Sequence, residues 1–232
     1  MNLEKMLTAQ AELDKHIVEK KGLHGVVLVP NTFLALQVEL AEFANEGRWF
    51  KHWSDNQKPR IEAYVECFAC NGTGDLNYEM VQEDAEGNGD HEYIDCPDCD
   101  CSGFSGTKNP LLEEFADGVH FFLSIAYQKG WQDALYIYEE QLDPDEFDGD
   151  LTSYYLEMTY FINKSHFENP SKEKDDKFKD TFGFPQKQYW FRTSWILFLN
   201  IGINGFGFTP EQIEEAYFSK HKVNYERQEN GY

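Results

Sequence analysis

Two pairs of acidic residues at helical spacing are the features of this sequence most suited to chemistry. Glu39 and Glu42 form the first pair, and Glu114 and Asp117 form the second. At roughly 100° of rotation per residue, the members of each pair lie on one side of a helix, beside a stripe of leucine and phenylalanine. Such carboxylates can meet across a helical bundle, where they repel each other unless cations neutralise them.

Four converging carboxylates would form a metal site made of oxygen ligands. Oxygen ligands favour hard ions such as Mg²⁺ or Mn²⁺, and a water on such an ion is a nucleophile suited to hydrolysing a nucleoside polyphosphate. The alternative is that each pair belongs to a solvated helix face, as a single E-x-x-E usually does. Glu113 also lies near Asp117 on the helical wheel and could replace Glu114 as the inward-facing partner.

Five cysteines, all within residues 67–101, indicate a second metal site. Four of them form two C-x-x-C knuckles, Cys67 with Cys70 and Cys96 with Cys99. Four thiolates at this spacing predict a tetrahedral, structural Zn²⁺ site, and the first knuckle is similar to the zinc repeats of DnaJ-type chaperones. Cys101 is a fifth thiol, which either replaces Cys99 or stays free.

The last helical stretch carries a local cationic face, formed by Lys220, Asn224 and Arg227 at helical spacing. Lys and Arg bind phosphate oxygens, and Asn can bind a sugar hydroxyl or a base edge. The alternative, which spacing alone favours, is that the two cations complement the C-terminus of their helix.

Helices must position these residues, and the sequence predicts an all-α fold. Outside the cysteine window it lacks the period-2 alternation that is typical of strands. The predicted helices cover residues 1–21, 31–47, 110–129, 131–142, 151–164 and 189–204, with a last one from Thr209. Asn31 or Thr32 is the expected N-cap of the second helix, and the last helix begins with a capping box, Thr209 to Gln212. Residues 164–188 are polar and predict a surface excursion.

Residues 61–107 differ from the rest of the chain. They contain all five cysteines and 12 acidic residues but no Lys or Arg. We therefore expect a small zinc-binding module inserted into one all-α domain that spans residues 1–232.

Composition limits the partners of the protein. The 232 residues include 20 Lys and Arg against 42 Asp and Glu, a formal net charge of −22, which argues against broad binding to nucleic acid or anionic lipid. The N-terminal stretch lacks an apolar signal core, and the longest strongly apolar stretch, Trp195 to Ile203, is too short to cross a bilayer. We expect a cytoplasmic protein with no nucleic-acid and no membrane partner.

Four motifs, taken in order, resemble a known enzyme family. They are Gln10–Ile17, Glu39–Ser54, Leu112–Phe121 and Tyr217–Tyr232. Together they resemble the dimeric, all-α dUTP diphosphatases (dUTPases) of the MazG-like pyrophosphatase group, in the form common in Gram-positive bacteria and their phages. The matches cover roughly residues 1–60 and 108–232, and the resemblance implies the helical bundle of that family.

The resemblance also implies roles for individual residues. Two or more Mg²⁺ ions would be held by four carboxylates, Glu39, Glu42, Glu114 and Asp117, which selects Glu114 over Glu113. One glutamate of the first pair would orient or deprotonate the attacking water; Glu39 is favoured, and Glu42 is not excluded.

Substrate contacts follow from the same resemblance. Gln10 and Asp14, with Trp49 or Trp53 as an aromatic wall, would form the uracil pocket, although both tryptophans could equally serve core or dimer packing. Phosphates and deoxyribose would be held by Lys220, Asn224 and Arg227, with Lys51 as a further phosphate contact.

The implied reaction is the hydrolysis of dUTP to dUMP and pyrophosphate, with dUDP as a second substrate, in a homodimer. A related pyrophosphatase for dCTP or a modified nucleotide is the first alternative, because Asp14 stands where some relatives carry Asn. A non-catalytic, zinc-bearing interaction protein is the second. The cysteine insertion departs from the family pattern and could brace the loop near the metal site or bind a protein partner.

Overall fold

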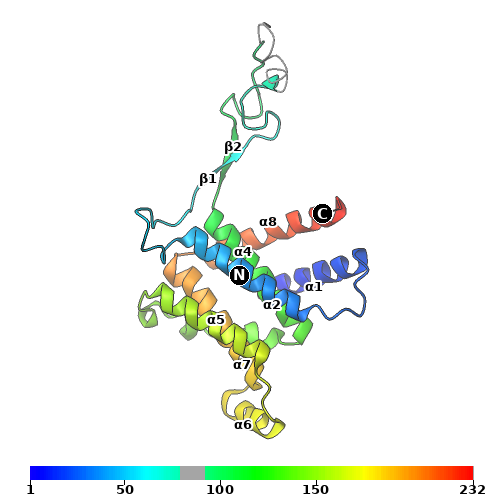
Figure 1. The fold of residues 1–232 in the computed structure, drawn as a ribbon, viewed down its shortest axis with the longest axis vertical. Helices are drawn as coiled ribbons and strands as arrows, with labels where there is room; N and C mark the ends of the chain where they lie inside the picture. The colour runs from blue at the N-terminus through cyan, green and yellow to red at the C-terminus, as the bar shows by residue number, and fades with distance from the viewer. Residues whose placement is uncertain (79–91, 232) are drawn as a thin grey trace. The chain divides into compact units, whose positions relative to one another are not determined.

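Helices make up the first unit of the chain, Met1–Pro59 with Leu111–Tyr232 (Figure 1). The computed structural model describes residues 1–78 and 92–231. The α-helices are α1 (Leu3–Lys20), α2 (Val29–Gly47), α4 (Pro110–Lys129), α5 (Leu151–Phe167), α6 (Lys172–Phe182), α7 (Gln186–Asn200) and α8 (Pro210–Glu229). The predicted all-α fold is confirmed.

Side-chain caps fix where several helices begin. The Asn2 side chain accepts a hydrogen bond from the Lys5 amide at the start of α1, and Asp150 caps α5 in the same way. At α8, the predicted capping box forms between Thr209 and Gln212. Each cap satisfies an amide that has no partner within its own helix.

The second helix begins earlier than predicted. α2 starts at Val29, and its N-cap residue, Leu28, has no side-chain cap bond. Thr32 therefore lies inside the helix, where its hydroxyl donates to the Leu28 carbonyl at 3.1 Å. The prediction of Asn31 or Thr32 as N-cap is wrong, because Pro30 can occupy the first turn without needing an amide partner.

α4 lies at the centre of the packing between α2 and α7. The ring of Phe115 on α4 stacks on Phe198 of α7, with centroids 4.1 Å apart, and meets Phe43 of α2 edge-on at 5.4 Å. Gly118 makes this approach possible, because a Cβ there would lie 2.8 Å from the Phe198 ring. α1 packs against α8, and α5 packs against α7.

The segment predicted as a helix over 131–142 forms short 3₁₀ turns instead. They are η1 (Gln132–Leu135), η2 (Glu139–Leu142) and, just beyond, η3 (Pro144–Glu146). Side chains of α7 take the carbonyls that a helix would use: Arg192 donates to Ala134 at 2.9 Å, and Asn200 donates to Gln141 at 2.9 Å. Tertiary hydrogen bonds thus outweigh local helix propensity here.

Residues 164–188 are more ordered than a surface excursion. They include the end of α5 and the whole of α6. The sequence of α6 is mostly polar, but it has a small apolar face. Phe178 and Phe182 pack against Tyr189 of α7, with ring centroids 5.2 and 5.0 Å apart. α7 then ends in a single π-helical turn, η4 (Ile201–Gly205).

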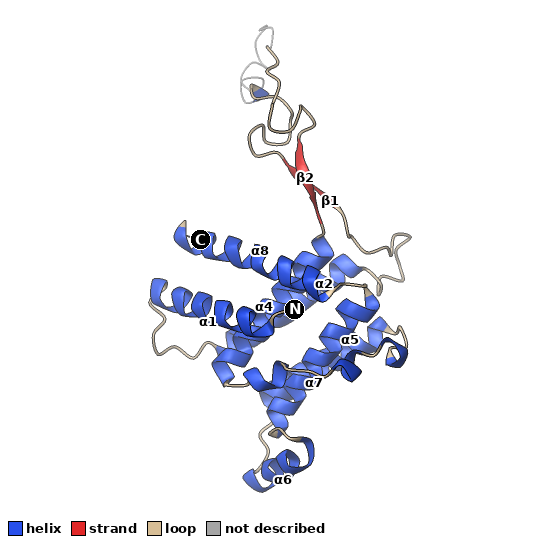
Figure 2. Ribbon diagram, turned by 180° about the vertical axis from the view of Figure 1, so that it is seen from behind, coloured by secondary structure: helices blue, strands red, loops and turns tan. Residues whose placement is uncertain are grey.

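The second unit, Arg60–Pro110, contains the only strands among the described residues. Strand β1 (Ala63–Glu66) pairs antiparallel with β2 (Phe104–Lys108), as Figure 2 shows in red. Residues 79–91 of the predicted module, and Tyr232 of the closing motif, lie outside the described residues. Across the described part of the chain, no helix has the length and apolar character needed to span a bilayer.

Candidate functional site

Three of the predicted carboxylates meet between α2 and α4. Oxygen atoms of Glu39, Glu42 and Glu114 all lie within 4.8 Å of one another. Glu39 and Glu114 are half-buried, whereas Glu42 is exposed. The i,i+3 spacing places each pair on one helix face, and the packing of α2 on α4 turns those faces together.

The fourth carboxylate, Asp117, is held by a cation from α8. Lys220 Nζ lies 2.7 Å from Asp117 Oδ2, and both side chains are largely shielded from solvent. Burial alone would lower the pKa of Lys220, but the hydrogen bond and charge of Asp117 outweigh burial and raise it. Lys220 is therefore firmly charged beside the acidic cluster.

The carboxylate cluster is electrostatically unfavourable on its own. Burial, followed by repulsion from Asp117 and Glu42, raises the pKa of Glu39 to about 7. Burial and repulsion from Asp117 likewise raise the pKa of Glu114 to about 7, although Lys220 opposes the shift. Half-buried oxygen ligands that repel one another are the donor set expected for a hard divalent cation.

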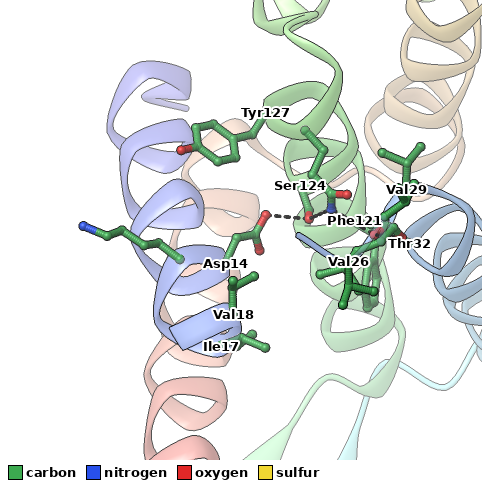
Figure 3. Close-up of a pocket in the computed structure, with 13 residues that line it drawn as sticks. Asp14, Ile17, Val18, Val26, Val29, Thr32, Phe121, Ser124 and Tyr127 are labelled. Carbon is green, nitrogen blue, oxygen red and sulfur yellow. Dashed lines mark hydrogen bonds between the residues drawn. The ribbon is translucent and has the colours of Figure 1, made fainter. Parts of the chain in front are cut away.

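A cavity of about 530 Å³ opens farther along α4 (Figure 3). Asp14 on α1 and Ser124 on α4 face each other in it, and the Ser124 hydroxyl donates to Asp14 Oδ2 at 2.6 Å. Its walls are largely apolar, with Ile17, Val26 and Phe121 among them. Seven residues of helix separate Ser124 from Asp117, which corresponds to roughly 10 Å along the axis.

A chain of hydrogen-bonded polar side chains runs from this cavity to His120. One end of the Gln10 side-chain amide lies 2.8 Å from Asp14 Oδ1, and its other end lies 2.7 Å from Nδ1 of His120. On the other side, Gln128 donates to the Ser124 hydroxyl at 3.1 Å and to Thr32 at 2.9 Å. The chain joins α1, α2 and α4.

The four predicted zinc ligands come together within the second unit. All four cysteines are buried, and the sulfurs of Cys67 and Cys96 lie 3.8 Å apart. The sulfurs of Cys70 and Cys99 are separated by 3.7 Å. A tetrahedral ion with Zn–S bonds near 2.3 Å requires sulfurs about 3.8 Å apart, so the arrangement fits zinc. Cys101 lies outside this group.

Backbone amides support both knuckles. Gly74 donates to the Cys70 sulfur at 3.1 Å, and Gly103 donates to the Cys99 sulfur at 3.3 Å. Both glycines have φ of +78°, and a Cβ on either would come within 2.3 Å of a carbonyl oxygen. Only glycine fits these turns.

A family model described as dUTPase matches residues 2–81 and 103–232, nearly the whole chain. The chain belongs to the dUTPase family. It is therefore a dUTP diphosphatase, an enzyme that hydrolyses dUTP, and the predicted family and enzyme class are confirmed. A search of curated proteins gave no match.

The other substrate residues predicted for this dUTPase include two tryptophans and Lys51, whose surroundings differ from one another. Trp49 packs in the aromatic core against Phe43 and Phe206, and Trp53 is 68 % exposed. Among the described residues, neither tryptophan lines the cavity at Asp14. Lys51 donates to the Asn45 carbonyl at 3.2 Å.

On α8, Asn224 and Arg227 follow Lys220 at one-turn intervals. Asn224 is half-buried and Arg227 exposed. Burial raises the pKa of Asp117, although the hydrogen bond and charge of Lys220, and the charge of Arg227, oppose the shift. The α8 residues thus approach the carboxylate cluster through Lys220, and Arg227 acts on Asp117 electrostatically.

Sequence reasoning missed the part that His120 plays. The signal was present, because polar residues recur at positions 117, 120, 124 and 128, where α4 is otherwise apolar from residue 115 to residue 128. That spacing follows one helix face. The same face therefore carries both the acidic cluster and the polar wall of the cavity.

Proposed function

We propose that this dUTPase hydrolyses dUTP to dUMP and pyrophosphate at the carboxylate cluster, with Mg²⁺ held there by four residues, Glu39, Glu42, Glu114 and Asp117. The convergence of carboxylates from α2 and α4 within 4.8 Å is the observation that carries the proposal. The donor set fits the ion because the cluster has oxygen ligands only. dUDP, which presents the same base and a diphosphate, is a proposed second substrate.

Bound divalent cations would neutralise phosphate charge and acidify the attacking water. The chain's own residues then position the reactants. Glu39, the more buried of the α2 pair, orients this water or takes its proton. Lys220 lies beside Asp117 and can bind a phosphate oxygen, and Asn224 and Arg227 extend this contact along α8.

The cavity at Asp14 is proposed to hold the base. Its volume suits a nucleoside, and its distance from Asp117 along α4, roughly 10 Å, suits the span between a base and its phosphates. Close apolar walls would exclude the methyl group of thymine, and polar groups at Asp14 would read the uracil edge.

A panel of dNTPs tests the proposed function. With Mg²⁺, dUTP is expected to be hydrolysed with the highest kcat/KM, and EDTA is expected to stop turnover. Faster hydrolysis of dCTP or of a modified nucleotide would support the related pyrophosphatase instead. No turnover of any dNTP would favour a non-catalytic protein.

Replacing Lys220 is expected to weaken substrate binding. Lys220→Met removes the cation beside Asp117 and should raise KM for dUTP about tenfold or more, because charge-assisted phosphate contacts are among the stronger hydrogen bonds. The matched control is Lys222→Met, which removes an exposed lysine two residues away on the same helix. Equal effects in both variants would indicate a general charge effect rather than a phosphate contact.

An exposed apolar face on α2 and α5 is the proposed homodimer interface. The two helices run antiparallel, since Phe33 of α2 contacts His166 near the end of α5, whereas Ala44 and Thr152 line one groove. Leu34 and Leu156 are 64 % and 62 % exposed on this face. A second copy of the same helix pair would complete a four-helix arrangement.

Leu156→Asp is expected to shift the protein from dimer to monomer in sedimentation velocity, because a charge would be buried at the interface. Val223→Asp is the control, since Val223 is an exposed apolar residue on α8. A Leu156→Asp protein that remains dimeric would exclude this face as the interface.

A further inference from the structure

Three buried side chains behind the base cavity form a hydrogen-bonded unit. Gln10, His120 and Tyr217 come from α1, α4 and α8, and each is less than 5 % exposed. The His120 ring stacks on Tyr217, with centroids 4.1 Å apart. The Tyr217 hydroxyl lies 3.0 Å from the Met6 carbonyl and donates to it. The unit reaches the cavity through Gln10, which contacts Asp14.

Hydrogen-bond chemistry fixes one proton on His120. Its Nε2 lies 3.1 Å from the Tyr217 backbone carbonyl, which can only accept, so Nε2 carries a hydrogen. A neutral imidazole then has a bare Nδ1, which is an acceptor. The end of the Gln10 amide lies 2.7 Å from Nδ1, and a bare Nδ1 requires the amide NH₂ there.

The Gln10 amide links the protonation of His120 to that of Asp14. If its NH₂ faces His120, its carbonyl faces Asp14 Oδ1, and Asp14 must carry a proton to donate to it. If instead its NH₂ faces Asp14, as the 2.8 Å contact allows, its carbonyl needs a hydrogen on Nδ1, and His120 must be a cation. Besides the hydrogen on Nε2, each arrangement therefore contains one further proton, which lies on Asp14 in the first arrangement and on Nδ1 of His120 in the second.

The surroundings favour the arrangement with neutral His120. Burial, together with the charges of His221 and Lys220, lowers the pKa of His120 to about 3, although the hydrogen bond to the Tyr217 carbonyl opposes the shift. Burial also raises the pKa of Asp14, although the hydrogen bond from Ser124 opposes the shift.

The Tyr217 hydroxyl lies 3.1 Å from the end of the Gln10 amide that faces His120 and gives its one hydrogen to the Met6 carbonyl, so it can accept only from an NH₂ there. The geometry therefore also turns the Gln10 carbonyl to Asp14, and the proton belongs on Asp14, where it points at Gln10.

We propose that His120 is a specificity-determining positioning residue, which acts through Gln10 to hold the Asp14 proton away from the base cavity. Asp14 then offers only lone pairs to the cavity. Uracil, which has a hydrogen on N3, can donate to such a group, whereas cytosine has a bare N3 that cannot. The inference rests on the proposed function, since it takes the cavity at Asp14 as the site of the base.

Two variants of His120 separate this role from a purely structural one. His120→Leu removes Nδ1, the alternative site of the further proton, so the proton stays on the buried Asp14 carboxyl. When Gln10 turns its NH₂ to Asp14, this proton no longer has Gln10 as its acceptor and becomes available to cytosine. The ratio of kcat/KM for dUTP to that for dCTP should fall about tenfold or more, as expected when one hydrogen bond stops discriminating. His120→Asn places an acceptor near the position of Nδ1 and should keep the ratio within about threefold of the wild type.

Gln10→Met tests the same link from its other end, in case His120→Leu does not fold. It should also lower the ratio of kcat/KM for dUTP to that for dCTP, because residue 10 then has no amide oxygen to accept the Asp14 proton. Unchanged ratios in the folded variants would overturn the inference.

Spectroscopy of the free protein tests the proton positions without turnover. Nitrogen NMR should show His120 with a hydrogen on Nε2 alone, the signal being assigned by its loss in His120→Asn. Infrared difference spectra between wild type and Asp14→Asn should show a protonated carboxyl group. A doubly protonated His120 or an ionised Asp14 would overturn the inference, whereas a failure to hydrolyse dUTP would overturn the proposed function alone.

Discussion

Glu39→Gln is expected to lower kcat for dUTP hydrolysis by about a thousandfold or more, with little change in the fold. The substitution keeps the size of the side chain but removes one charged oxygen ligand and the group that handles the attacking water. Losing a metal ligand or a group that stabilises developing charge commonly costs factors of 10²–10³ or more. Steady-state kinetics at saturating Mg²⁺ and dUTP measure the effect.

Glu114 and Glu113 provide a matched pair for this prediction. Glu114 belongs to the group of carboxylates within 4.8 Å, and its neighbour Glu113 does not. Glu114→Gln should therefore abolish activity as Glu39→Gln does, whereas Glu113→Gln should retain most of it. The reverse order would mean that Glu113 is the inward ligand, and near wild-type rates in both Glu39→Gln and Glu114→Gln would contradict the assigned metal site.

The stability of Glu39→Gln in EDTA distinguishes the loss of a catalytic group from misfolding of the protein. Without cations the cluster is repulsive, so removing the charge of Glu39 should stabilise the folded protein. We expect a gain of a few tenths of a kcal/mol to about 1 kcal/mol in the free energy of unfolding, since solvent screens a half-exposed group. Urea unfolding in EDTA measures it, and a clear loss of stability would show that Glu39 supports the fold itself.

The sequence predicted the parts of the fold that depend on local signals. The capping box at Thr209 and the apolar stripes of α2 and α4 are encoded within one or two turns of helix, so these helices form as predicted, apart from the start of α2. The segment over 131–142 has equally local helix signals, yet it forms 3₁₀ turns, because Arg192 and Asn200 bind its carbonyls from far along the chain. Such partners cannot be read from the segment alone.

In the candidate site, too, the sequence predicts the features that depend on local spacing but not those that depend on how helices pack. Glu39 and Glu42, like the C-x-x-C knuckles, have a spacing that already shows which side chains share a face. The pairing of His120 with Gln10 joins residues 110 positions apart and follows from how α1 packs against α4. Trp49 was ambiguous for another reason: an aromatic ring suits a base wall and a core equally, and only the packing around Phe43 distinguishes the two.

Replacing Cys67 and Cys96 together with Ser is expected to release zinc and unfold the Arg60–Pro110 unit. Outside the four buried cysteines, the described part of this unit has no buried hydrophobic residue, and its hairpin is only two strands wide. Two-stranded hairpins are at best marginally stable alone, whereas structural zinc contributes roughly 10–16 kcal/mol in small zinc folds. Metal analysis should show about one zinc per chain in the wild type and none in the variant.

Cys101→Ser is the control that makes this prediction specific. Cys101 lies outside the group of four sulfurs, so its loss should leave both the zinc content and amide protection in β1 and β2 unchanged. Hydrogen exchange should separate the two units, with β1 and β2 losing protection in the double variant while α4 and α7 keep theirs, because their shared core of Phe115 and Phe198 contains no metal ligand. Zinc retained in the double variant would disprove the four-cysteine site, and zinc lost in Cys101→Ser would assign Cys101 as a ligand.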